Sequence, residues 1–448
     1  MGGGVTGSRA RFHRSLVPNG AKGRAVMRIA DLRLYVAGQA ASVFGSTLTA
    51  TATSVVAVVS LHATPREVSL IVVSATLPAL LFGPICGVLA DRIIRPRRML
   101  ILIDLFCGGV VLSIGAAAFT GVLTIVWLCA VGFLIGLAQI FVFALYFTHL
   151  RSLDDVQDLG AARGRLQSSE MLSRAVAASI AGPVLAALGA PLLFFLDALS
   201  YGFSASCLRA LRSPDRRASQ PEPRAGILRE MRAGVSVVRS HPLLSAFAVY
   251  AFLLNVGNNG TTAQRALFLL DTLHLPVALY SAPMVAATLV GALGSQLAPK
   301  LLERGLPPRR LMLMCSTSAV IATLALPLAG GPLWSVLTLI TVGIALPVLF
   351  GAAGNLALIT ILSDDIGDEY FGRMTTLLTS VVTLASAIGA LLGGVLGERF
   401  GVRNGIWLCQ AISVVAVTVL LVSVRRSGTR TAGSPTADSA DTAAGVSS

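Results

Sequence analysis

The sequence consists largely of apolar runs about 20 residues long, separated by short polar and basic connections. A helix rises 1.5 Å per residue, so a run of about 20 residues crosses the roughly 30 Å hydrocarbon layer of a membrane. Because lipid offers no partners for backbone N–H and C=O groups, such runs must fold as helices. Only 12% of the residues are charged and the mean hydropathy is +0.78, whereas a soluble domain carries about 25% charged residues. The composition therefore predicts an integral membrane protein.

Twelve such runs divide into two sets of six, with the longest connection between the sets. The runs are residues 34–61, 68–90, 99–119, 122–148, 166–188, 192–208, 244–270, 277–298, 311–329, 332–362, 374–396 and 404–424. We therefore expect an all-α membrane protein whose twelve transmembrane helices form two pseudo-symmetric six-helix bundles, at residues 34–208 and 244–424.

The segments outside the bundles are polar and basic. Residues 1–33 lack the apolar core of a signal peptide, so we expect a disordered basic cytoplasmic tail there and a second disordered cytoplasmic tail at residues 425–448. The cytoplasmic linker, residues 209–243, carries Ile227, Met231 and Val235 at helical spacing among arginines. This pattern favours an amphipathic helix on the membrane surface over a plain solvated linker.

The basic residues give the orientation. The chain has 35 Lys and Arg against 21 Asp and Glu, and nearly all of the basic residues fall on the side that holds both termini. The opposite side has only Arg66, Arg399 and Arg403. Because loops rich in Lys and Arg stay in the cytoplasm, we expect a multi-pass protein of the plasma membrane with both termini cytoplasmic.

Short motifs of the first set of runs recur at matching places in the second. The pairs are Gly164-Arg165 with Gly372-Arg373, Arg97-Arg98 with Arg309-Arg310, and residues 196–200 (LDALS) with residues 409–413 (CQAIS). Two similar halves of six helices are the layout in which one bundle rocks against the other around a site at the membrane midplane.

The connection between the second and third runs carries the strongest motif, GVLADRIIRPRR at residues 87–98. A small residue allows close helix approach, and a carboxylate beside four guanidinium groups can form a cluster that separates when the bundles move. Anchoring by positive loops would explain the arginines but not Asp91. We expect a cytoplasmic gate formed by Gly87, Asp91, Arg92, Arg95, Arg97, Arg98, Gly372 and Arg373.

This connection resembles the G-x-x-x-D-R-x-x-R-x-R-R loop of the major facilitator superfamily, with Ile94 where many members have Gly. The chain is also similar to the exporter branch that includes enterobactin exporters, macrolide efflux pumps and drug:proton antiporters. The matching stretches are residues 42–49, 77–78, 166–185, 197–200 and 372–401. The resemblance covers residues 32–424 and implies a monomeric exporter that works by alternating access, with protons as the coupling ion.

Within the fifth run, Ala181-Gly182-Pro183 resembles the antiporter signature of that superfamily. Pro183 removes a backbone hydrogen bond, and the small neighbours permit close packing. The resemblance implies that Gly182 and Pro183 hinge or seal the outward route, although proline kinks in membrane helices also occur for purely structural reasons.

Polar residues recur on single helical stripes in four runs. These candidates for the substrate cavity are Gln39, Ser42, Ser46 and Thr49; Gln139 and Tyr146; Asn255, Asn258, Thr262 and Arg265; and Asn355. Polar side chains that faced lipid would cost free energy, so they face either a cavity or a neighbouring helix. The resemblance implies a cavity, because the first, fourth, seventh and tenth helices line it in the superfamily.

Few ionisable residues lie within the runs: Asp104, Glu170, Arg174, Asp197 and Arg265. A charge inside the membrane is costly to keep and is a functional candidate by default. Arg265 is the residue that we most expect to face the cavity. The runs expected to line the cavity have no deep carboxylate, so Asp104 and Asp197 are the proton-coupling candidates, and coupling itself is implied by the resemblance.

Several classes of function are disfavoured. The six cysteines lie singly in apolar runs without metal-ligand spacing, no phosphate-binding G-x-x-x-x-G-K-[ST] loop is present, and the basic residues sit in short loops. We expect no metal, cofactor or nucleic acid, and no enzyme. The expected function is export of a small apolar or amphipathic compound, such as a drug, antibiotic or siderophore-like metabolite. The alternatives are an importer or facilitator on the same scaffold and a non-transporting membrane sensor.

Overall fold

The structure is a computed structural model that describes residues 19–152, 159–211, 242–365 and 368–431. The regular structure of these residues is entirely helical, which confirms the predicted fold class. The α-helices are α1 (Asn19–Val55), α2 (Pro65–Arg92), α3 (Pro96–Thr120), α4 (Ile125–Ser152), α5 (Leu159–Leu188), α6 (Ala190–Ala210), α8 (Pro242–Leu267), α9 (Ala282–Glu303), α10 (Pro308–Thr323), α11 (Leu333–Asp365), α12 (Asp368–Phe400) and α13 (Val402–Thr431). Three short helical segments join them: η1 (Val56–Ser60), η2 (Phe268–Thr272) and η3 (Val277–Leu279).

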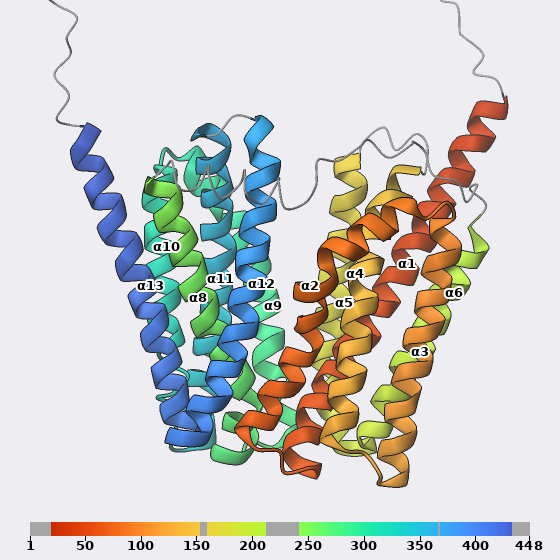
Figure 1. Cartoon of the computed structure of the whole chain (residues 1–448), viewed down its shortest axis with the longest axis horizontal. Coiled ribbons are helices and arrows are strands. Elements are labelled where there is room, and N and C mark those ends of the chain that lie inside the picture. The colour runs from red at the N-terminus through yellow and green to blue at the C-terminus, as the bar shows by residue number, and fades with distance from the viewer. Residues whose placement is uncertain (1–18, 153–158, 212–241, 366–367, 432–448) are drawn as a thin grey trace, which may run out of the picture.

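The helices form two bundles with the same internal arrangement. In the N-terminal bundle α6 packs on α1 and α3, and α4 packs on α2; in the C-terminal bundle α13 packs on α8 and α10, and α11 packs on α9. Figure 1 shows the start of α1 and the end of α13 at the same end of the molecule, which we call the inner end. The ribbons of the two bundles lie apart at the inner end and meet toward the opposite, outer end.

Local sequence explains where the helices begin and end. At the start of α2, the Thr64 side chain accepts the Glu67 backbone N–H while the Glu67 carboxylate accepts the Thr64 N–H, which forms a capping box before the first turn. Gly121 ends α3 at a φ of 74°, a left-handed conformation that costs glycine little. These caps fix the short turns at the outer end.

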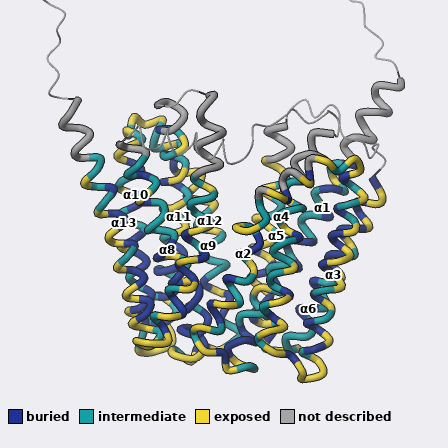
Figure 2. The backbone as a smooth tube through the Cα atoms, in the orientation of Figure 1, coloured by how far each residue is buried: buried dark blue, intermediate teal, exposed yellow. Residues whose placement is uncertain are grey.

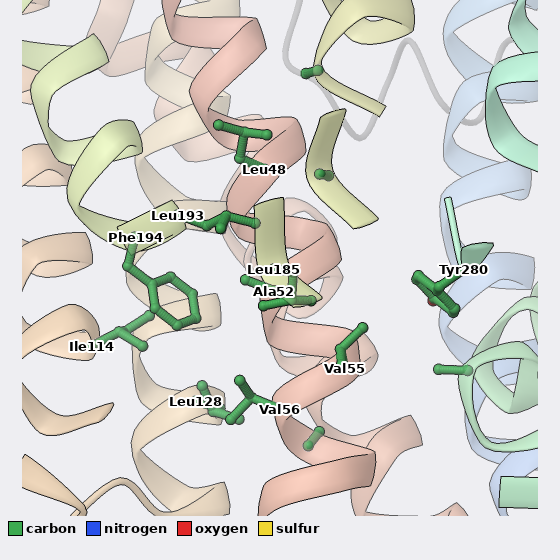
Figure 3. Close-up of a cluster of buried hydrophobic side chains, with 14 of the residues drawn as sticks. Leu48, Ala52, Val55, Val56, Ile114, Leu128, Leu185, Leu193, Phe194 and Tyr280 are labelled. Carbon is green, nitrogen blue, oxygen red and sulfur yellow. The ribbon is translucent and has the colours of Figure 1, made fainter. Parts of the chain in front are cut away.

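The buried core follows the helix faces that turn toward neighbouring helices (Figure 2). Phe194 of α6 and Ile114 of α3 are almost fully buried, and Figure 3 shows them side by side near Leu193. The same cluster includes Leu269 and Tyr280 from the C-terminal bundle. The hydrophobic core is therefore continuous from one bundle to the other.

Ten of the described helices are long and apolar enough to cross a membrane by length and composition, and α8 and α10 fall short of that criterion. Helix α8 is interrupted by polar residues, among them Asn258 and Arg265, and α10 has only 16 residues. Both helices pack in the C-terminal bundle as α1 and α3 pack in the N-terminal one. The repeat thus places α8 and α10 as spans of the same kind.

The described helices extend beyond the apolar runs. Helix α1 starts at Asn19, inside the stretch that we expected as a tail, while its apolar part starts at Asp31. The added turns contain Ala, Arg and Met, which favour helix. Helix α13 likewise continues to Thr431. The expected amphipathic linker helix and residues 1–18 and 432–448 lie outside the described residues.

We predict that a large side chain at Gly45 destabilises the fold. A Cβ at Gly45 would overlap the Ser200 hydroxyl and the Asp197 carboxyl of α6, so Gly45→Leu must push α1 off α6, at a cost of about 1–3 kcal/mol. Thermal unfolding of the purified protein in detergent measures the effect. Gly109→Leu is the control, because nothing lies within 4 Å of its Cβ position; equal melting temperatures for the two variants would contradict this packing.

Candidate functional site

The outer end is closed first by contact between α2 and α12. Gly394 of α12 lies directly on Ser69 of α2, where a Cβ would overlap the serine side chain. One turn further along α12, a Cβ at Gly397 would stand 3.1 Å from the Pro65 Cβ. Ser69 is only 1% exposed. Because Gly394 and Gly397 have no side chain, α2 and α12, which belong to different bundles, can pack tightly here.

A second contact joins α5 to the start of α9. The backbone N–H of Gly182 donates a hydrogen bond to the Ser281 hydroxyl at 3.2 Å, and both groups are buried. A Cβ at Gly182 would lie 2.7 Å from the Ala278 carbonyl oxygen, so only glycine fits here. Pro183, the next residue along α5, is exposed. Of the predicted hinge residues, Gly182 therefore forms the contact and Pro183 does not.

The two contacts are related by the internal repeat. The register that aligns Arg97 with Arg309 also aligns Ser69 with Ser281, and α2 meets α12 as α9 meets α5. We name the residues of these two contacts, Ser69, Gly394, Gly182 and Ser281, the outer seal. Sequence reasoning missed both serines and Gly394, although extending the register of the repeat would have paired the serines.

Four of the predicted cavity residues, on three helices, are exposed. Gln139 of α4, Asn258 and Thr262 of α8 and Asn355 of α11 are all exposed although they lie within long apolar helices. Asn259, beside them on α8, donates to the Ser386 hydroxyl of α12 at 3.1 Å. Their place in a cavity and their contact with a substrate stay predictions.

Arg265 lies in the last turn of α8. It is half-buried, and its buried Nε has no hydrogen-bond partner. Its guanidinium interacts electrostatically with Tyr280, whose hydroxyl meets the Ser54 hydroxyl of α1. Arg265 thus stands next to the region where the two bundles meet, within the membrane-spanning part of the chain.

The polar residues of α1 face two directions. Ser42 is buried, and the Ser46 hydroxyl lies 3.3 Å from the Tyr201 hydroxyl of α6. Gln39 is half-buried and Thr49 has a buried hydroxyl. In this conformation Ser42 and Ser46 therefore lie within the N-terminal bundle, and their role in a cavity stays a prediction.

The opposite face of α1 carries three hydroxyl residues that were not predicted from the sequence. The side chains of Thr47, Thr51 and Ser54 donate to carbonyl groups one turn earlier on α1, at 2.8, 3.0 and 2.9 Å. They were missed because they are one or two positions out of step with the stripe chosen from the sequence. Their helical positions lie about half a turn away from Gly45, which faces α6.

Both proton-coupling candidates are buried where α1, α3 and α6 meet. Asp104 accepts a hydrogen bond from the Ser204 hydroxyl at 2.7 Å, and Asp197 accepts one from the Ser200 hydroxyl at 3.2 Å. Asp104 is 7% exposed and Asp197 is 1% exposed. The structure thus brings both carboxyl groups to one polar junction inside the N-terminal bundle, away from the exposed residues of α4, α8 and α11.

The predicted cytoplasmic gate lies at the inner end. Arg97 donates to the Leu211 carbonyl at 2.8 Å, and Arg92, Arg95 and Arg98 are exposed. The side chains of Asp91, Tyr146 and Arg373, and the surroundings of Gly87 and Gly372, lie outside the described part of the structure. A latch between Asp91 and the arginines therefore stays a prediction.

Metal ligands do not gather anywhere in the described ranges. No group of three or more His, Cys, Asp or Glu residues there could hold a metal ion, and all six cysteines are free. The chemistry of this part of the chain is that of hydroxyl, amide and guanidinium groups between apolar helices.

Two six-helix bundles of the same internal arrangement, which share a core at one end and carry polar faces between them, define a membrane transporter. Residues 35–359 match the model of the Major Facilitator Superfamily, and the chain belongs to that family. No curated protein matches the sequence. Membership in this family indicates a transporter and not an enzyme, as expected from the sequence.

Solved transporters share the fold over nearly the whole chain. A point mutant of the nucleoside transporter NupG has a TM-score of 0.73 at 15% identity and covers 88% of this chain and 99% of its own. A bacterial homologue of the iron transporter ferroportin, in an inward-facing state, has a TM-score of 0.68 at 15% identity, over 88% and 98%. A bacterial homologue of the human lysosomal transporter Spinster, inward-facing and occupied, has a TM-score of 0.66 at 13% identity, over 90% and 97%.

We predict that filling the outer seal opens the outer end. Gly394→Leu places a side chain where Ser69 packs, so α12 must move away from α2. Spin labels at Phe119→Cys and Trp334→Cys, two exposed outer positions in different bundles, should report a longer distance than in the parent protein.

Gly109→Leu is the matched control for that experiment, since its Cβ position is open. It should leave the distance between the two labels unchanged. An unchanged distance in Gly394→Leu would show that α2 and α12 do not hold the outer end closed.

Proposed function

We propose that the protein exports a small apolar or amphipathic compound, such as a drug, antibiotic or siderophore-like metabolite, across the plasma membrane by alternating access. The observation that carries this proposal is the outer seal, with Gly182 of the Gly-Pro pair at its centre. A seal at the outer end and bundles that diverge at the inner end suit a carrier that loads its cargo from inside (Figure 1).

The arginines of the inner end give the orientation of the protein in the membrane. The inner end carries Arg92, Arg95, Arg97 and Arg98, together with the start of α1 and the end of α13. Basic loops remain on the cytoplasmic side. We place both termini in the cytoplasm, and the inner end therefore faces the compartment from which an exporter takes its substrate.

The exposed polar residues suggest how a substrate is held. Asn258 and Thr262 stand one turn apart on α8, Gln139 and Asn355 lie on α4 and α11, and Arg265 adds one cation. Amide and hydroxyl groups donate and accept hydrogen bonds, while the surrounding helices are apolar. This combination suits an amphipathic molecule with several hydrogen-bond acceptors.

The protein works as a monomer, because each chain has both bundles.

Energy for export comes from protons. Asp104 and Asp197, like Asp31 near the inner end of α1, are buried carboxyl groups of the N-terminal bundle, and a buried carboxyl group is suited to bind and release a proton. The arginine-rich loop at residues 87–98 acts as the inner latch through Asp91. In this proposal the latch must separate whenever the inner end opens.

The direction of transport is testable with membrane vesicles. Everted vesicles that contain the protein should accumulate one or more of a panel of fluorescent amphipathic dyes against a gradient, and an uncoupler should abolish the accumulation. Vesicles without the protein are the control. Accumulation in intact cells instead of everted vesicles would contradict export.

Arg265 should be needed for transport but not for folding. Its buried Nε has no hydrogen bond to lose, and its contact with Tyr280 is electrostatic only, so Arg265→Gln should change the melting temperature little while dye accumulation falls at least tenfold. Arg399→Gln is the matched control, because Arg399 is exposed at the outer end of α12. Full transport by Arg265→Gln would remove this residue from the proposed cavity.

A further inference from the structure

The polar junction of the N-terminal bundle is built around Asp197. Helix α1 presses its backbone against this residue, since a Cβ at Gly45 would overlap both the Asp197 carboxyl and the Ser200 hydroxyl. Thr49 of α1 brings a hydroxyl to the same carboxyl group. The carboxyl group is thus enclosed by three helices, accepts a hydrogen bond from Ser200 and is almost fully shielded from solvent.

In the part of the chain that the structure describes, the groups that face Asp197 include no cation. Helix α1 contributes Gly45 and Thr49, α3 contributes Cys107 and, further inward, Asp104, and α6 itself contributes Ser200 and Tyr201. On α5, which also touches α6, Arg174 is exposed and Glu170 is half-exposed. An isolated carboxylate is costly to bury in such surroundings, so a neutral carboxyl group fits this site better.

In the C-terminal bundle, the position that corresponds to Asp197 holds a residue that does not ionise. The repeat aligns Gly45 and Thr49 with Gly257 and Thr261, and Asp197 and Ser200 with Gln410 and Ser413. Gly257 packs on Ser413 just as Gly45 packs on Ser200. The junction of α8, α10 and α13 is therefore the counterpart of the junction of α1, α3 and α6.

Gln410 fills that counterpart with a neutral amide. Its Nε2 donates to the Thr261 hydroxyl at 3.2 Å, and its Oε1 accepts from the Thr323 hydroxyl at 2.8 Å. An amide can donate and accept at the same time, as a protonated carboxyl group can, whereas a carboxylate can only accept. Asp104 also has an uncharged counterpart, Ser316, which accepts from Tyr250 at 2.8 Å.

We infer that the coupling proton binds inside the N-terminal bundle, on the Asp197 carboxyl at the junction of α1, α3 and α6, rather than among the residues that face the substrate. The position calls for a neutral hydrogen-bonding group, and the N-terminal bundle supplies one that can lose its proton. In each cycle the carboxylate takes up one proton when the site is reached from outside. It releases that proton when the site is reached from inside.

Helix α1 is the element that links this site to the substrate. One face of α1 carries Gly45 and Thr49 against Asp197, and the opposite face carries Thr47, Thr51 and Ser54. A charge on Asp197 would draw water or a cation into the junction and loosen α1 from α6. The inference rests on the proposed proton-coupled transport and assigns its proton to one residue.

Infrared spectroscopy of the full chain in lipid vesicles tests the site without a substrate. The parent protein should show the C=O absorption of a neutral carboxyl group at neutral pH, which disappears at alkaline pH, and Asp197→Asn should lack that component. Asp271→Asn is the control, since Asp271 is exposed at the outer end of η2. Asp104→Asn should keep the Asp197 component. The absence of a neutral carboxyl band in the parent protein, or its full retention in Asp197→Asn, would overturn the inference.

A second measurement separates this inference from proton coupling in general. The distance between spin labels at Phe119→Cys and Trp334→Cys should change with pH in the parent protein and in Asp271→Asn, and should not change in Asp197→Asn. A pH response that persists in Asp197→Asn would overturn the assignment and leave proton coupling intact. A parent protein that shows no pH response would overturn both.

Discussion

The arrangement of the two bundles depends on close backbone contact at the outer end. In lipid there is little hydrophobic drive to bring apolar helices together, so association relies on packing and on hydrogen bonds between helices. Gly394 and Gly182 supply the close approach, and the bond from the Gly182 N–H to the Ser281 hydroxyl adds a polar link. A contact made of small residues can also be separated, because it locks no large side chain between the bundles.

The two halves of the repeat pack in the same way but bury different polar groups. Both bundles place a glycine of their first helix against a serine of their last, at Gly45 and Ser200 and at Gly257 and Ser413. Beside these contacts the N-terminal bundle buries carboxyl groups, whereas the C-terminal bundle buries the amide of Gln410. One scaffold used twice thus gives two junctions of like geometry, of which only the N-terminal one can change its charge.

Periodicity and charge predicted the fold because both follow directly from the membrane. The apolar runs, the basic loops and the paired motifs led to two bundles of six helices, as the structure has them. The seal residues were harder to find. A glycine that touches Ser69 looks the same in sequence as Gly109, which touches nothing within 4 Å.

The polar residues of α1 show why the enclosed face of a helix is hard to predict from the sequence. Ser46 and Thr47 are neighbours in the chain, yet Ser46 approaches Tyr201 on α6 while Thr47 bonds only to its own helix. Periodicity shows that a polar face exists, but the packing of α6 decides which face is enclosed. The roles of Asp104 and Asp197 were open for the same reason, because their surroundings come from three separate helices.

The central claim is that closure of one end accompanies opening of the other. Two distances in the parent protein in lipid vesicles test it most directly: one between spin labels at the inner positions Ile94→Cys and Arg304→Cys, and one between labels at Phe119→Cys and Trp334→Cys, all at exposed sites. When pH or a transported dye shifts the populations, the inner distance should shorten as the outer distance lengthens. Two distances that lengthen together, or an inner distance that changes while the outer one stays fixed, would contradict it.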